Sequence, residues 1–252
     1  MHRFFVDKQS IREENEVIFI TDSDDVKHIA KVLRLQEKDE IEVCDGDHNE
    51  YIGEICSLDK TSIKVKIITK YRSATEADIN VTLFQGIPKA SKMDYIIQKC
   101  TELGIHAIVP VITERTIVQI KDKKSEEKKV ERWQKVAYEA AKQSKRGIIP
   151  QIMQPLHYKE LLDHTSTYDL MIVPYENELN SNMRQALENK EKIKRIGIII
   201  GPEGGFEESE IEAAKGCGVI PVTLGPRILR TETAGLIALS IVMYELGDLG
   251  GI

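Results

Sequence analysis

The sequence predicts an α/β protein: a small N-terminal β-barrel, then a mainly parallel sheet that helices cover on both faces. Two observations lead to this prediction. Up to about residue 72, short apolar runs alternate with turn signals, a pattern typical of a small barrel. From residue 79 onward, apolar strand patterns alternate with amphipathic helical patterns, which indicates a parallel sheet buried on both sides.

The N-terminal part begins with a predicted strand over residues 16–20. Residues 22–25 (Asp-Ser-Asp-Asp) then offer N-cap side chains for a helix whose apolar residues recur at helical spacing: Val26, Ile29, Ala30 and Leu33. Further strands are predicted over residues 41–44, 51–55 and 62–67. The polar stretch 72–78 is the best candidate for a linker.

The second part begins with a predicted strand over residues 81–85. Ser91 and Asp94 resemble a capping box that opens a helix, and Gly104 ends this helix. The remaining predicted strands are 107–112, 169–173, 195–200 and 219–224. The remaining predicted helices are a long one through Val130, Trp133 and Ser144, followed by 180–189, 207–217 and 231–246. Trp133 lies on an apolar helical face, which favours the core or a dimer interface.

Composition sets limits on the class of protein. The chain has 252 residues, of which 41% are hydrophobic, enough to bury a sizeable core. It contains no apolar run of membrane-spanning length, and its first residues lack a signal-peptide pattern, so we predict a cytoplasmic protein. The four cysteines show no Cys-x-x-Cys spacing and the six histidines are scattered, so we predict no metal site.

Charge is distributed unevenly along the chain. The net charge of −6 alone argues against nucleic-acid binding. Residues 115–146, however, contain eleven Lys or Arg and five Asp or Glu, giving 11 − 5 = +6 and leaving −6 − 6 = −12 for the rest. A basic face of this kind can bind phosphates. A solvated helix with pairs such as Glu131–Lys135 explains the same composition, so both interpretations stay open.

Two glycine-bearing turns are the most informative local feature. Residues 201–206 read Gly-Pro-Glu-Gly-Gly-Phe, and residues 224–234 read Leu-Gly-Pro-Arg-Ile-Leu-Arg-Thr-Glu-Thr-Ala. Each follows an apolar strand pattern and leads toward a helical one. Glycine permits positive φ and close approach to a ligand, and small molecules bind at the carboxyl ends of parallel strands. The two turns therefore predict a cofactor pocket.

The first turn is not a phosphate-binding loop. It lacks the Lys-Ser/Thr pair of a P-loop and does not follow the Gly-x-Gly-x-x-Gly pattern. Glu203 would repel a phosphate, and Pro202 removes a main-chain N–H donor. A neutral or cationic ligand fits better, and S-adenosyl-L-methionine, which carries a sulfonium cation, is such a ligand.

The two turns together resemble the SPOUT methyltransferases, and more narrowly the family of ribosomal RNA small subunit methyltransferase E. Further matches lie along the whole chain, at residues 1–5, 33–34, 86–89, 99–104, 113–115, 132–133, 139–146 and 150. The resemblance implies a PUA-like RNA-binding barrel over residues 1–72 and a SPOUT methyltransferase domain over residues 76–252, with a C-terminal trefoil knot. It also implies a homodimeric enzyme of ribosome biogenesis that uses S-adenosyl-L-methionine to methylate N3 of a uridine in 16S ribosomal RNA, within the small ribosomal subunit.

The resemblance also assigns cofactor-binding residues to three turns. They are Pro174, Tyr175 and Glu176 in one turn; Gly201, Glu203, Gly204 and Gly205 in the next; and Leu224, Gly225, Ile228, Leu229 and Thr233 in the last. A plain turn role explains Tyr175 and Glu176 equally well.

Methylation at a uracil N3 requires loss of the imide proton and stabilisation of the resulting anion. Arg230, at the mouth of the second glycine turn, is our candidate for positioning or stabilising the base. Glu232 is a candidate for orienting Arg230 through a bidentate pair or for acting as base. An equally good alternative is that Thr231 caps the last helix and Glu232 only complements its dipole.

Basic and polar side chains supply candidate RNA contacts. They are Arg3, Lys89, Lys92, Arg115, Arg132, Lys142, Gln143 and Arg146. Two alternatives to the leading function stay open: a SPOUT methyltransferase of another RNA position, and a non-catalytic RNA-binding assembly factor with a degenerate cofactor pocket.

Overall fold

The computed structural model describes residues 1–118, 122–188 and 193–251. These residues form two compact units. The first consists of Met1–Glu76 together with Ala141–Ile149, and the second of Ala77–Ala140 together with Pro150–Ile252. The long helix α3 (Lys123–Gln143) therefore contributes its last residues to the first unit, which the sequence did not predict.

The first unit is built on a curled six-stranded sheet in the order β1-β4-β5-β6-β3-β2. β1 pairs in parallel with β4, and the other neighbours are antiparallel. The strands expected around residues 16–20, 41–44, 51–55 and 62–67 are confirmed, and the last two are longer than predicted. The bounds are β1 Arg3–Phe5, β2 Ile11–Arg12, β3 Val17–Ile20, β4 Glu40–Cys44, β5 Asn49–Leu58 and β6 Ile63–Arg72.

Alternate strand residues of the first unit point into one core. Ile18 and Ile20 of β3 are fully buried there, as is Val43 of β4. Asp22 accepts hydrogen bonds from the N–H groups of Asp24 at 3.0 Å and Asp25 at 2.9 Å, and so begins the predicted helix. This helix consists of α1 (Ser23–Lys27) and a π-helical continuation (His28–Leu33).

The second unit is built on a sheet whose strand pairs, among the described residues, are all parallel. The order is β10-β8-β7-β12-β11-β13, with β9 beside β8. The predicted parallel sheet is therefore confirmed. The bounds are β7 Asn80–Gly86, β8 Ala107–Ile112, β9 Gln151–Ile152, β10 Leu156–His157, β11 Leu170–Pro174, β12 Arg195–Ile200 and β13 Ile220–Val222.

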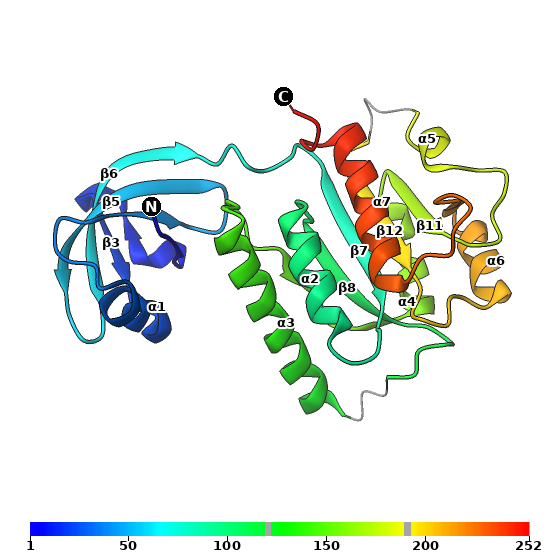
Figure 1. The fold of residues 1–252 in the computed structure, drawn as a ribbon, viewed down its shortest axis with the longest axis horizontal. Helices are drawn as coiled ribbons and strands as arrows, with labels where there is room; N and C mark the ends of the chain where they lie inside the picture. The colour runs from blue at the N-terminus through cyan, green and yellow to red at the C-terminus, as the bar shows by residue number, and fades with distance from the viewer. Residues whose placement is uncertain (119–121, 189–192, 252) are drawn as a thin grey trace. The chain divides into compact units, whose positions relative to one another are not determined.

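Helices cover both faces of this sheet, as predicted. Leu83 and Ile198 pack into a core with α2 (Lys92–Glu102), α3 and α7 (Thr231–Leu246). Their neighbours Phe84 and Ile199 pack into the opposite core, with α4 (Tyr158–Asp163) and α6 (Glu208–Gly216). Figure 1 shows α2 and α7 running over the near face of the sheet. Trp133 is buried in the first of these cores, which bears out the core interpretation.

Some local predictions were wrong. Ser91 precedes α2 but its side chain makes no capping hydrogen bond, and the Asp94 carboxylate pairs with Arg132. The helix expected over residues 180–189 is the single turn α5 (Met183–Ala186), and Asn189 lies outside the described residues. The short elements β1, β2, β9, β10 and α4 were not predicted, because two to six residues are too few for a periodic pattern. Within the described ranges, no helix combines the length and apolar character that crossing a bilayer requires.

Candidate functional site

Three turns meet at one edge of the parallel sheet. They follow β11, β12 and β13, which are neighbours in the order β12-β11-β13 and all run in the same direction. Their carboxyl ends therefore lie together, which is where open α/β sheets bind ligands. The turns line a cavity of about 440 Å³.

Most of the predicted cofactor residues line this cavity. They are Pro174, Tyr175, Glu176, Gly201, Glu203, Gly204, Gly205, Leu224, Gly225, Ile228 and Leu229. Thr233 instead lines a second cavity next to the first, together with Glu232. The structure adds lining residues that sequence reasoning did not assign to the pocket, among them Lys92 and Arg227. Lys92 lines both cavities.

Backbone geometry explains several of the glycines. Gly205 has φ of 68° and Gly225 has φ of 104°, in the left-handed region that favours glycine. At Gly201, a Cβ atom would lie 3.1 Å from the Phe206 ring, so the first turn closes tightly on itself. At Gly204, a Cβ would lie 3.2 Å from the Cβ of Arg115.

The Thr231 side chain connects α7 to β7 and to the glycine turn that follows β12. Its hydroxyl donates to the Gly201 carbonyl at 2.5 Å and accepts from Nε2 of Gln85 on β7 at 2.9 Å. Arg230, not Thr231, occupies the N-cap position of α7, and it makes no side-chain capping bond. The alternative in which Thr231 caps the last helix is therefore wrong, because its hydroxyl is used to hold the turn.

A lysine lies between two carboxylates on the wall that the two cavities share. Nζ of Lys92 is 3.0 Å from Oε1 of Glu203 and 3.5 Å from Oε2 of Glu232. Oε1 of Glu203 also accepts the N–H of Lys89 at 3.0 Å. Glu232 thus pairs with Lys92 and not with Arg230, so the expected bidentate Arg230–Glu232 pair is absent.

The pKa values of this pair move in opposite directions. Burial raises the pKa of Glu203, but hydrogen bonds from its own main chain, Lys92 and Lys89 outweigh burial and lower the pKa overall. The hydrogen bond to Glu203 raises the pKa of Lys92. Both groups are therefore held in their charged forms at neutral pH.

Arg230 is exposed and is one of the residues that line the cofactor cavity. Its carbonyl accepts hydrogen bonds from the N–H groups of Thr233 at 2.9 Å and Ala234 at 2.8 Å, which fixes the start of α7. No ion pair to its guanidinium is recorded in the described part of the chain. The Arg230 side chain is therefore available to a ligand.

Arg115 has a role that the sequence did not indicate. Its guanidinium donates to Glu207 at 2.8 Å and to the carbonyl of Gly204 at 2.8 Å, so it braces the first turn. The hydrogen bond to Glu207 raises the pKa of Arg115. Lys89, Arg132 and Gln143 are exposed and remain candidate RNA contacts. Lys121 of the basic stretch lies outside the described residues.

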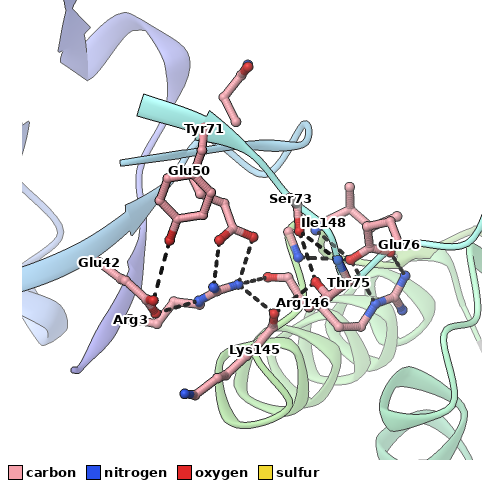
Figure 2. A network of polar contacts seen from close by, with 12 residues as sticks. Arg3, Glu42, Glu50, Tyr71, Ser73, Thr75, Glu76, Lys145, Arg146 and Ile148 are labelled. Carbon is pink, nitrogen blue, oxygen red and sulfur yellow. Dashed lines mark hydrogen bonds and ion pairs between the residues drawn. The ribbon is translucent and has the colours of Figure 1, made fainter. Parts of the chain in front are cut away.

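Arg3 and Arg146 do not lie on the surface, which corrects our expectation that they contact RNA. The Arg3 guanidinium contacts Glu42 at 3.1 Å, Glu50 at 2.8 Å and the carbonyls of Lys145 and Arg146 at 2.6 and 2.7 Å (Figure 2). Arg146 is 3% exposed and pairs with Glu76 at 2.6 Å. Both arginines therefore stabilise the first unit. Lys142 is similarly engaged with Asp25 at 2.8 Å.

The site contains no sign of a metal centre. Across residues 1–118, 122–188 and 193–251, no group of three or more His, Cys, Asp or Glu side chains is arranged to hold an ion.

Comparison with known proteins places this geometry in a family. An RNA methyltransferase domain model matches residues 75–243, and an RNA methyltransferase PUA domain model matches residues 20–68. Ribosomal RNA small subunit methyltransferase E of Bacillus subtilis is 36% identical over 255 residues, covering 100% of this chain and 99% of the relative.

Solved structures agree with this match. Ribosomal RNA small subunit methyltransferase E from Neisseria gonorrhoeae, bound to S-adenosyl methionine, has a TM-score of 0.87, 31% identity and 99% coverage of both chains. A Legionella pneumophila methyltransferase, in complex with the same cofactor, has a TM-score of 0.86, 30% identity and 98% coverage of both chains. The chain therefore belongs to the ribosomal RNA small subunit methyltransferase E family of RNA methyltransferases.

Proposed function

We propose that this protein uses S-adenosyl-L-methionine to methylate N3 of a uridine in 16S ribosomal RNA of the small ribosomal subunit. The observation that carries the proposal is the cavity at the carboxyl ends of β11, β12 and β13, which the residues of all three predicted turns line together. Membership of the family supports ribosomal RNA as the substrate.

The residues of the cavity suit this cofactor. A volume of about 440 Å³ falls in the range of small-molecule sites. The turn from Leu224 to Leu229 offers main-chain groups to an adenine, and the acidic side chains of Glu176 and Glu203 suit a cation better than a polyphosphate. The relatives from N. gonorrhoeae and L. pneumophila bind the same molecule. When bound, it supplies an electrophilic methyl group.

The chain's own residues then act on the base. We assign Arg230 to positioning the uracil and stabilising the charge that develops when the N3 proton leaves, because this exposed arginine lines the cavity. Glu232 lies beside the cavity on the first turn of α7, where a carboxylate can accept that proton. Thr233 completes this turn.

We also propose that the protein acts in the cytoplasm as a homodimer with a trefoil-knotted C-terminal segment. Helices α2 and α7 expose large side chains on the second unit: Tyr95 is 48% exposed, Ile237 is 40% exposed and Tyr244 is 67% exposed. Tyr95 and Ile237 line the same cavity. Exposed apolar side chains gathered in this way favour contact with a second copy of the chain. Analytical ultracentrifugation, which measures the oligomeric state, tests the proposed homodimer.

A transfer assay tests the function. Purified protein is incubated with labelled S-adenosyl-L-methionine and either small subunits that lack the modification, naked 16S RNA or transfer RNA. We expect label in small-subunit RNA, and Arg230→Ala to keep cofactor affinity by calorimetry while losing turnover. Label only in transfer RNA would favour another RNA position. RNA binding without cofactor binding would favour the assembly factor.

A further inference from the structure

The turn between β7 and α2 lies against the first glycine turn. The proposed function assigns no role to this turn. β7 lies beside β12 and runs parallel to it, so this turn and the first glycine turn leave the sheet side by side. The contact is close: a Cβ on Gly86 would lie 2.6 Å from the main-chain nitrogen of Pro202. Only glycine allows the two turns to approach in this way.

The same turn contains a strained residue. Ala90 has φ of 55°, in the left-handed region that costs a non-glycine residue free energy. Strain of this kind persists where surrounding contacts hold it, and it gathers at functional sites. Here the bend precedes α2 and brings both the N–H of Lys89 and the ammonium of Lys92 to the carboxylate of Glu203.

Lys92 also contacts a carboxylate on α7. Its second partner, Glu232, stands on the first turn of α7, and Oε2 of Glu232 is buried without a hydrogen bond in the described structure. The ion pair with Lys92 is what compensates this oxygen. The Lys92 ammonium thus connects Glu203 of the first glycine turn to Glu232, the residue that we assign as proton acceptor.

We propose that Lys92 is a positioning residue of the methyl-transfer site: it holds the carboxylates of Glu203 and Glu232 at the wall between the two cavities. This inference rests on the proposed function, because methyl transfer is one of its readouts. Lys92 acts through the two glutamates and contacts neither the methyl group nor the base.

Removal of the Lys92 ammonium would take away the cation that Glu203 and Glu232 share. The groups that face Glu203 are Lys92 and the N–H of Lys89, and the group that faces Lys92 from α7 is Glu232. Arg227, Arg230 and Glu176 lie elsewhere around the cofactor cavity. Without Lys92, the pKa of Glu203 would lose the lowering that the ammonium provides, and the two carboxylates would no longer be held together.

The test compares Lys92→Met with Lys92→Arg and with the control Lys99→Met. Lys99 lies two turns further along α2 and pairs with Glu102 at 2.7 Å, away from both cavities. For each protein, cofactor affinity is measured by calorimetry from about pH 5 to pH 8, and single-turnover methyl transfer is measured with saturating cofactor and small subunits.

We expect Lys92→Met to lower the single-turnover rate about tenfold or more, as loss of a charged hydrogen bond does. Its cofactor affinity should fall more steeply toward low pH than that of the wild type, because Glu203 without Lys92 becomes protonated at a higher pH. Lys92→Arg should restore most of both properties, and Lys99→Met should match the wild type. Glu203→Gln should lose activity as well, and adding Lys92→Met to it should cost less than in the wild type.

Two results would overturn the inference: a Lys92→Met rate within twofold of the wild type, or a loss that is independent of pH and not rescued by arginine. Failure of the proposed function looks different, because the wild type itself would then transfer no methyl group to the small subunit. The pH dependence of cofactor affinity still tests Lys92 in that case.

Discussion

Replacing Thr231 by valine removes one hydroxyl and keeps the shape of the side chain. Thr231 is 7% exposed, and its hydroxyl both donates to the Gly201 carbonyl and accepts from Gln85. Valine can do neither. Gln85 is fully buried but keeps its second hydrogen bond, from Nε2 to the carbonyl of Gly86 at 2.9 Å. The principal loss therefore falls on the carbonyl of Gly201, at the start of the first cofactor turn.

The expected size of the effect follows from these contacts. A part-buried carbonyl that loses its donor costs about 1–3 kcal/mol, and the weakened Gln85 contact adds a smaller amount. We therefore expect Thr231→Val to lower the free energy of unfolding by about 2 kcal/mol. Because the released carbonyl belongs to the cofactor turn, we also expect affinity for S-adenosyl-L-methionine to fall about tenfold, equivalent to about 1.4 kcal/mol.

Urea unfolding and calorimetry measure the two effects, and Thr231→Ser is the matched control because it keeps the hydroxyl. The serine variant should retain most of the affinity. If the valine and serine variants have the same stability and the same cofactor affinity, then the Thr231 hydroxyl does not hold the turn, and the reasoning is wrong.

Three further predictions concern stability and reactivity. Glu76→Gln should lower the free energy of unfolding by about 3 kcal/mol, because it removes the carboxylate charge that the buried Arg146 guanidinium contacts at 2.6 Å, whereas Glu212→Gln at an exposed pair should have no measurable effect in the same urea titration. Burial raises the pKa of Cys44 to about 12, so a thiol reagent at pH 8 should modify the exposed Cys56 and spare Cys44, and rapid modification of Cys44 in native protein would contradict its burial. The folded-state pKa of Glu203 is lower than its ordinary value of 4.5, so its ionised form stabilises the protein above pH 4.5, and this contribution disappears as the pH falls through the lowered pKa. Glu203→Gln should therefore make the free energy of unfolding less dependent on pH between about pH 5 and pH 3. An unchanged slope would argue against the lowered pKa.

The sequence predicted those parts of the site that depend on residues close together along the chain. The glycine turns at 201–206 and 224–234 follow strand patterns directly, and parallel strands bring their ends together, so the cavity follows from the order of the elements. Contacts between distant segments leave no such pattern. Glu203 and the N–H of Lys89 are 114 residues apart, and nothing in either segment indicates that they meet.

The same limit explains the wrong predictions. Arginines are usually exposed, so Arg3 and Arg146 suggested RNA contacts, whereas partners up to 143 residues away bury them. Ser91 and Asp94 matched a capping box, but Arg132 from another helix competes for the carboxylate of Asp94. At Gly204, a side chain would meet Arg115, a contact that the spacing of the turn does not reveal.

The identity of the methylated nucleoside shows whether this protein methylates N3 of a uridine in 16S ribosomal RNA. Small subunits from a strain that lacks the modification are incubated with the protein and S-adenosyl-L-methionine, and the 16S RNA is digested to nucleosides for mass spectrometry. We expect 3-methyluridine, formed by the wild type and lost with Arg230→Ala. A different methylated nucleoside, or no methylated product although the cofactor binds, would contradict this expectation.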